Sequence, residues 1–222
     1  MGLRGNWEGA ITLYDRAIAL EPTYGAAYEG RAGAYHAQGR HEEAVQDYSR
    51  AMAIRETSRL YMERGHAYLE LGRYVQSDED YHRVLAVGLP SSSAYIGMGD
   101  AHRAMGGLEE AARSYSEAIV LDPESWRAYY LRGVCYFRLR QYQQALEDFE
   151  RVITLQPHSV GAYFARGAIR WLSGQCTDAL EDFEAFVALS DGEEALSQAH
   201  EYIEYLRTAA PCEPPSDIPL LF

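Results

Sequence analysis

Small and aromatic residues return along the chain at the spacing of one helix face, with polar residues between them. In one stripe a small residue is followed by an aromatic residue four places later and by a small or apolar residue three places after that. Residues spaced by four and three share one face of an α-helix. The stripe occurs six times at intervals of 33 or 34 residues: Ala10, Tyr14, Ala17; Ala44, Tyr48, Ala51; Ser77, Tyr81, Val84; Ala111, Tyr115, Ala118; Ala145, Phe149, Val152; and Ala179, Phe183, Phe186.

A second helical stripe precedes each of the last five stripes, so each unit is predicted to be a pair of amphipathic helices. Its members are Tyr28, Ala32, Tyr35; Tyr61, Gly65, Tyr68; Tyr95, Gly99, His102; Tyr129, Gly133, Tyr136; and Tyr163, Gly167, Arg170. Between the two helices we predict a turn, because glycine suits the left-handed backbone that ends a helix. The turn residues are Gly39, Gly72, Gly106 and Gly174, with Arg140 as the exception.

The order aromatic, glycine, tyrosine, turn glycine, alanine, aromatic, alanine and proline resembles the tetratricopeptide repeat (TPR) family over nearly all of residues 1–208. The resemblance implies an all-α fold, a right-handed superhelical solenoid of antiparallel helix pairs with a C-terminal capping helix. We expect a half repeat at 1–24 that holds only the second helix, full repeats at 25–57, 58–91, 92–125, 126–159 and 160–193, a capping helix at 194–208 and a proline-rich tail at 209–222.

Arginine and aspartate recur together in the repeats. Four units carry an arginine in the first helix and an aspartate one place before the aromatic residue of the second helix, whereas the unit at 92–125 has Met98 and Ser114 at these places. Because the arginine and the aspartate are either both present or both absent, and because a guanidinium fork matches a carboxylate, we predict a structural ion pair between the two helices. The predicted pairs are Arg31 with Asp47, Arg64 with Asp80, Arg132 with Asp148, and Arg166 with Asp182.

The charge of the chain disfavours several partners. The net charge is −13 with a pI near 4.9, which argues against nucleic acid, RNA included, and against anionic membranes. No lysine is present, which removes Schiff-base and phosphate-loop lysine chemistry. We find no HExxH, GxSxG or phosphate-loop motif, so we expect no enzyme activity and no cofactor.

Cysteine and the N-terminal residues bear on the compartment. Cys135, Cys176 and Cys212 lie far apart without a CxxC pair, which favours reduced thiols and no metal site. Residues 1–20 read as an amphipathic helix rather than a secretory signal, and no apolar run is long enough to span a membrane. We therefore expect a cytoplasmic protein. Because the first unit holds only its second helix, the sequence is also compatible with a fragment of a longer protein.

In the family that the chain resembles, the first helices line a concave groove that binds peptide segments. Carried onto this chain, the groove positions are Ala26, Glu29, Gly33, His36, Arg59, Met62, His66, Leu69, Ser93, Ile96, Asp100, Arg103, Arg127, Tyr130, Val134, Phe137, Gly161, Phe164, Ala168 and Trp171. The last two units present Tyr130, Phe137, Phe164 and Trp171 beside Arg127 and Arg138, the chemistry of a binding hot spot. The alternative is that these side chains pack between neighbouring first helices.

The resemblance implies a non-catalytic protein–protein interaction scaffold that binds a peptide or protein segment in the groove. The alternative is a regulatory or targeting module cut from a larger enzyme or sensor. The lysine and asparagine clamp with which chaperone-binding members hold a C-terminal carboxylate is absent, since its places hold Glu29 with Gly33, Met62 with His66, and Asp100.

The end of the sequence departs from the repeat. Leu196, Ala199, Ile203 and Leu206 form the apolar face of a helix that would cap the array. Beyond it, the apolar residues of the proline-rich tail are expected to dock on the chain itself or on a partner: Ile218, Leu220, Leu221 and Phe222.

Overall fold

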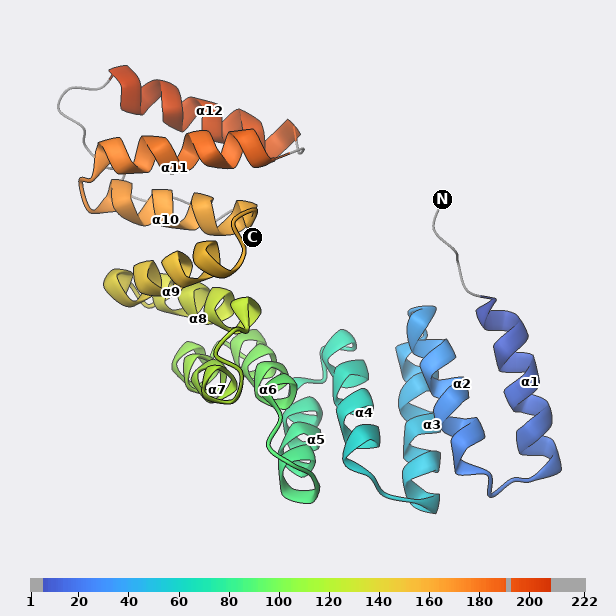
Figure 1. Ribbon diagram of the computed structural model, residues 1–222. Coiled ribbons are helices and arrows are strands. Elements are labelled where there is room, and N and C mark those ends of the chain that lie inside the picture. The colour runs from blue at the N-terminus through green and yellow to red at the C-terminus, as the bar shows by residue number, and fades with distance from the viewer. Residues whose placement is uncertain (1–5, 191–192, 209–222) are drawn as a thin grey trace. The chain divides into compact units, whose positions relative to one another are not determined.

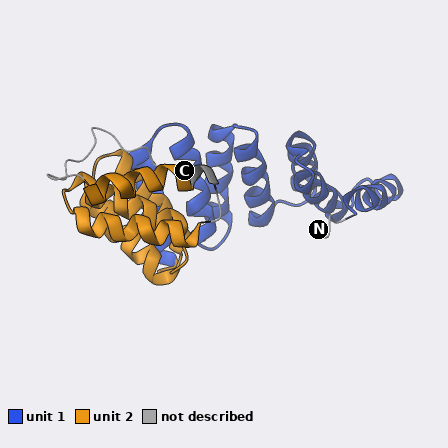
Figure 2. Cartoon of the chain, turned by 90° about the horizontal axis from the view of Figure 1, so that it is seen from above, with its two compact units in different colours: residues 1–121 blue, residues 122–222 orange. Residues whose placement is uncertain are grey.

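The computed structural model describes residues 6–190 and 193–208, and these residues form twelve α-helices and no strand (Figure 1). The all-α prediction is therefore confirmed. The chain divides into two compact units, residues 1–121 and 122–222 (Figure 2). The helices of the first unit are α1 (Trp7–Leu20), α2 (Gly25–Ala37), α3 (His41–Ile54), α4 (Ser58–Glu70), α5 (Tyr74–Val87), α6 (Ser92–Ala104) and α7 (Leu108–Leu121). Those of the second unit are α8 (Trp126–Arg138), α9 (Tyr142–Leu155), α10 (Val160–Leu172), α11 (Cys176–Leu189) and α12 (Glu193–Thr208).

Sequential helices pack as pairs within each unit. In the first unit α2 packs on α3, α4 on α5 and α6 on α7, and in the second α8 packs on α9 and α10 on α11. Consecutive pairs meet through α3 and α4, α5 and α6, and α9 and α10, while α1 packs on α2 and α12 on α11. Each unit is thus an array of helix hairpins in which every helix contacts its neighbours in the sequence.

The turns within the pairs have the backbone that the glycines predict. The φ angle is +76° at Gly39, +71° at Gly72, +86° at Gly106 and +77° at Gly174. Arg140 adopts the same left-handed conformation with φ of +59°, although it has a side chain. The Gln141 amide donates to the Tyr136 carbonyl at 2.8 Å, the six-to-one bond that closes such a turn.

The core of each pair forms where an aromatic residue of the second helix lies on a small residue of the first. A Cβ atom added to Gly65 would lie 3.1 Å from the Tyr81 ring, and one added to Gly99 would lie 2.4 Å from the Tyr115 ring. Gly133 faces Phe149 in the same way. These rings are fully buried, and the missing side chains let the helices approach closely.

The four predicted arginine–aspartate pairs are present. In each, the guanidinium Nε and Nη2 donate to the aspartate carboxylate, as in Arg132, whose bonds to Asp148 are 2.9 and 2.7 Å long. The aspartates are 1–4% exposed. Burial raises the pKa of the Asp148 carboxyl, and the bonds from Arg132 oppose this rise. The remaining Nε-to-Oδ2 distances are 2.5 Å for Arg31 with Asp47, 2.8 Å for Arg64 with Asp80, and 3.0 Å for Arg166 with Asp182.

In three of the four repeats with this ion pair, tyrosines of the first helix lie on both sides of the guanidinium group. This arrangement was not predicted from the sequence. Arg132 lies 5.6 Å from the ring centre of Tyr129 and 5.7 Å from that of Tyr136. Cation–π attraction therefore reinforces the ion pair from both sides. The same brackets form around Arg31, from Tyr28 and Tyr35, and around Arg64, from Tyr61 and Tyr68.

In the repeat at 92–125, which lacks the arginine–aspartate pair, a histidine links the helices instead. His102 Nδ1 lies 3.3 Å from Ser114 Oγ, and its Nε2 lies 3.3 Å from Asp78 Oδ1. These contacts join α6 to α7 and to α5. A polar link between the helices is thus kept where Met98 and Ser114 replace arginine and aspartate.

The Arg140 turn generates a stability prediction. Replacing Arg140 with glycine should raise the free energy of unfolding by about 0.5–1 kcal/mol, because a side chain disfavours positive φ. The matched control, Gly174→Ala, should lower it by a similar amount, since a Cβ there meets no atom within 4 Å and only the backbone is strained. Urea denaturation followed by circular dichroism measures both, and an Arg140→Gly variant no more stable than the parent would contradict the explanation.

The buried ion pair generates a second prediction. Arg132→Met should cost about 3–5 kcal/mol, because it leaves a buried carboxylate unpaired. Asp148→Ser should cost less, since the Arg132 side chain is 20% exposed and Asp148 only 4%. The double variant reproduces the residues of the unit at 92–125, so its loss should be smaller than the sum of the single losses by more than about 0.5 kcal/mol.

Denaturant melts of the four proteins measure this coupling. The exposed pair of Arg113 with Glu110, 2.9 Å apart, supplies the control. Arg113→Met should cost no more than about 1 kcal/mol. Strictly additive losses for Arg132 and Asp148 would show that the two residues act independently.

Candidate functional site

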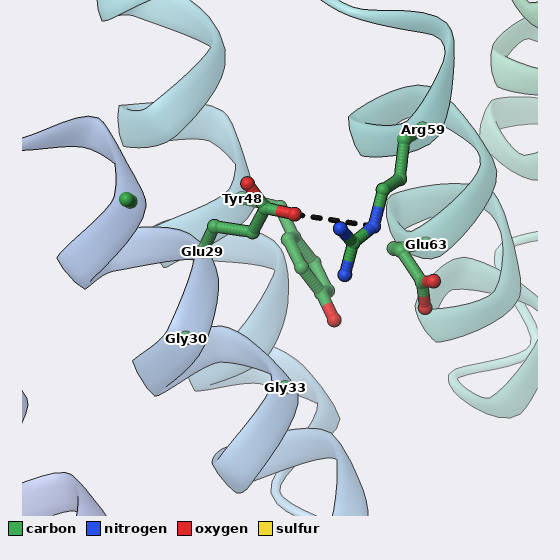
Figure 3. A pocket seen from close by; sticks show the side chains of 7 residues that line it. Glu29, Gly30, Gly33, Tyr48, Arg59 and Glu63 are labelled. Atoms are coloured by element: carbon green, nitrogen blue, oxygen red, sulfur yellow. Dashed lines mark ion pairs between the residues drawn. The ribbon is translucent and has the colours of Figure 1, made fainter.

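A pocket of about 420 Å³ opens in the first unit between α2 and α4, with α3 behind it (Figure 3). This volume falls in the range of about 300–1,000 Å³ that is typical of ligand sites. Small residues of α2 form one wall, and charged residues of α4 form the other. The lining residues are Ala26, Glu29, Gly30, Gly33, Tyr48, Arg59 and Glu63.

A second pocket of about 440 Å³ adjoins the first and shares Ala26, Glu29 and Arg59 with it. Its other walls are more apolar and include Tyr24 and Ile54, which are 48% and 44% exposed. The two pockets form one groove along α2 and α4, with a charged chamber and a more apolar chamber.

The charges of the groove are unevenly paired. Arg59 Nε lies 3.2 Å from Glu29 Oε1 (Figure 3), and both residues of this ion pair line both chambers. The Arg59 side chain is 75% exposed, so the pair is weak and can open at little cost. Glu63 is half-buried and forms no ion pair with any residue that the structure describes.

Tyr48 brings a hydroxyl group to the charged chamber. The residue is 3% exposed, and its hydroxyl end points into the gap between α2 and α4 (Figure 3). Burial raises the pKa of this phenol, and the Glu63 and Glu29 carboxylates raise it further while Arg59 opposes them. The phenol therefore stays protonated at neutral pH. It has no hydrogen-bond partner among the residues described.

The pocket exists because α2 carries no side chain at Gly33. Its counterparts, one repeat apart, contact the aromatic residue of their own second helix. His66 stacks edge-on against Tyr81 at 5.7 Å, and Asp100 accepts a 2.8 Å hydrogen bond from the Tyr115 hydroxyl. Val134 and Ala168 pack in the clusters of Phe149 and Phe183. Gly33, by contrast, places no side chain beside the end of its aromatic partner, Tyr48.

The groove residues that the sequence indicated within residues 1–121 fall into two groups in the structure. Arg59 lines the pocket, and so do Glu29 and Gly33. His66 and Asp100 are engaged with the core tyrosines, and Arg103 lies 3.6 Å from Asp100. The sequence placed the richest ligand chemistry in the second unit, whereas both pockets described here belong to the first.

The aromatic stripe of the second unit is largely packed. Tyr130 meets the Phe149 ring edge-on at 5.8 Å and approaches Gly161 of α10. Phe137 lies 5.7 Å from the Tyr142 ring, and Val134 packs on the same core. Arg127 and Arg138 are exposed.

Phe164 and Trp171 were expected on an open surface, and for these two the expectation is wrong. Phe164 is 0% and Trp171 3% exposed, because α12 lies over them. The Trp171 ring is 5.2 Å from Tyr202 and 5.4 Å from Tyr205, both on α12. The apolar face of α12 continues this core through Ala199, Ile203 and Leu206.

The remaining expectations concern metal sites, membrane spans, the cysteines and the C-terminal tail. Within the described ranges no group of three His, Cys, Asp or Glu residues could hold a metal, and no described helix is long and apolar enough to cross a membrane. Cys135 is buried, whereas Cys176 is disulfide-bonded, so the expectation of reduced thiols is wrong for Cys176. The tail with Ile218, Leu220, Leu221 and Phe222 lies outside the described residues.

Comparison with protein families gives a match over most of the chain. One tetratricopeptide repeat model matches residues 4–59, 96–160 and 136–194, and a second matches residues 58–87. The chain belongs to the tetratricopeptide repeat family. Its TPR helix pairs are the hairpins described above. A comparison with curated protein sequences gives no match.

Solved TPR structures have the same fold at low sequence identity. The C-terminal part of a TPR repeat-containing protein from Cytophaga hutchinsonii is similar with a TM-score of 0.79 and 19% identity, over 91% of this chain and 83% of that one. MamA from Desulfovibrio magneticus RS-1 gives 0.70 and 19%, over 76% and 97%. YrrB, described as a TPR protein with an unusual peptide-binding site, gives 0.68 and 17%, over 85% and 97%.

Two glycines of the pocket predict opposite responses to alanine. A Cβ atom at Gly33 would meet only the Tyr48 hydroxyl at 3.9 Å, so Gly33→Ala should stabilise the TPR array by about 0.5–1 kcal/mol through helix propensity. A Cβ at Gly30 would lie 2.3 Å from the Tyr14 ring, so Gly30→Ala should destabilise it. Thermal denaturation of the two variants measures the contrast. Equal effects would mean that α1 does not pack on α2 through this glycine.

Proposed function

We propose that this TPR protein is a non-catalytic interaction scaffold that binds an extended segment of a partner protein in the groove along α2 and α4. The observation that carries the proposal is the Tyr48 hydroxyl, which lacks a partner among the described residues and lies at a cavity beside the half-buried Glu63. A hydroxyl group at the wall of a cavity can donate a hydrogen bond to a ligand in the cavity and accept one from it.

The shape of the groove supports a peptide rather than a compact small molecule. Its two chambers adjoin along α2 and α4. Charged groups line one chamber, and the other adds the apolar residues Tyr24, Ala51 and Ile54 together with Arg55. An extended segment could place one side chain in each chamber. The exposed Arg59 at the boundary can move to admit it. YrrB, described as having a peptide-binding site, lends general support, although the likeness at 17% identity concerns the fold.

A random peptide library displayed on phage tests the proposal. The intact chain should enrich peptides that bind, after synthesis, with roughly micromolar dissociation constants. Gly33→Leu fills the charged chamber and should weaken binding by at least about tenfold, because a pocket contact is replaced by a clash. The matched control is Ala86→Leu, which adds the same side chain at an exposed place on α5. Fluorescence anisotropy measures the constants, and circular dichroism checks that each variant is folded.

Two outcomes would overturn the proposal. The first is a library that yields no peptide above background. The second is a set of peptides that bind the Gly33→Leu variant unchanged but lose affinity for Tyr130→Ala, which would place the ligand in the second unit instead.

A further inference from the structure

The charged chamber carries one unbalanced negative charge. Two carboxylates, Glu29 and Glu63, and one guanidinium, Arg59, line it. Arg59 is already paired with Glu29 at 3.2 Å, so the charge without a partner belongs to Glu63. An anionic ligand would have to break the existing pair and approach Glu63. A cationic ligand meets neither cost.

The groups around Glu63 are placed to complete a cation site. Its carboxylate is close enough to Tyr48 and to His36 to raise the pKa of both. Burial and the neighbouring His41 lower the pKa of His36, so at neutral pH this imidazole is uncharged and does not neutralise Glu63. The Tyr48 hydroxyl oxygen supplies a neutral acceptor on the same side. Hydrogen bonds from a charged donor to such groups are stronger than those between neutral groups.

The equivalent place in another repeat shows what this site lacks. In the unit at 92–125 the tyrosine hydroxyl is bonded to Asp100, and Arg103 lies beside that carboxylate. That unit therefore holds a tyrosine, a carboxylate and a guanidinium together. In the unit at 25–57, Gly33 removes the side chain at the Asp100 place and Glu63 provides a carboxylate from α4, while the guanidinium of the chamber, Arg59, is paired with Glu29 instead.

The floor of the chamber fits the stem of a basic side chain. Gly33 and Ala26 present little more than helix backbone, and the space at Gly33 is open to within 3.9 Å of the Tyr48 hydroxyl. A hydrocarbon stem of three or four carbons can lie on this floor with its charged end toward Glu63. The net charge of −13 also attracts basic segments over longer distances.

We propose that the charged chamber selects a basic side chain, arginine or lysine, of the bound segment, and that Glu63 and the Tyr48 hydroxyl hold its cationic end. The selection rests on the proposed function, because it names the residue of the peptide that the groove recognises. Glu29, Arg59 and the apolar chamber then contact the flanking residues of the segment.

Pentapeptide libraries with randomised flanks and both ends capped test the selection. The fixed central residue is arginine, lysine, citrulline or glutamate, and citrulline is the neutral analogue that matches arginine in shape. The intact chain should bind the arginine and lysine libraries roughly tenfold to a hundredfold more tightly than the citrulline library, and the glutamate library least. A further citrulline library with a free amino terminus distinguishes a side-chain cation from a terminal one.

Variants assign the selection to Glu63. Glu63→Gln should reduce the preference for arginine over citrulline to within about threefold, because the charge of the pocket becomes balanced. The matched control is Glu117→Gln, an exposed glutamate on α7, which should leave the preference unchanged. Thermal denaturation checks that both variants are folded.

The outcomes separate this inference from the proposed function. If arginine and citrulline libraries bind equally and Gly33→Leu abolishes both, the groove binds peptides without charge selection and only the inference fails. Preference for the free amino terminus, or an unchanged preference in Glu63→Gln, also overturns it. If no library binds more tightly to the intact chain than to Gly33→Leu, the proposed function fails with it.

Discussion

The structure depends on the contact between an aromatic residue of the second helix and a small residue of the first. Tyr81 lies on Gly65, Tyr115 on Gly99 and Phe149 on Gly133. A Cβ atom at Gly99 would overlap the Tyr115 ring, and one at Gly65 or Gly133 would press on its ring at 3.1 Å. Because one ring fills the space that one missing side chain leaves, the aromatic and the small residue must recur together, which sets the period of the sequence.

The buried ion pairs are fixed by the same close approach. The helices bring each guanidinium onto an aspartate that is at most 4% exposed, and tyrosines of the first helix bracket the guanidinium in three of the four units. Such a pair adds directionality that apolar packing lacks, since a shifted helix would leave a buried charge unpaired. In the unit at 92–125, His102 supplies a polar link in another way.

The repeats differ from one another at places that this framework leaves adjustable. The side chain of the residue that directly follows the small residue covers the end of the aromatic ring in most repeats, as His66 covers Tyr81 and Asp100 binds Tyr115. Gly33 leaves the end of Tyr48 uncovered and so creates a cavity beside Glu63. A repeat protein can thus gain a cavity by the loss of one side chain, because the rest of the helix pair already holds the surrounding groups in place.

The helices, the left-handed turns and the partners of the ion pairs could be predicted from the sequence alone, because these depend on contacts at fixed separations within one repeat. Even the exception at Arg140 was visible, and it has the predicted backbone. Which of the predicted groove side chains face solvent could be seen only once the packing of the helices was known. A stripe of aromatic residues looks the same whether it faces solvent or the next helix, and α12 covers Phe164 and Trp171. The pocket at Gly33 was equally hidden, since a cavity depends on what several helices together fail to fill.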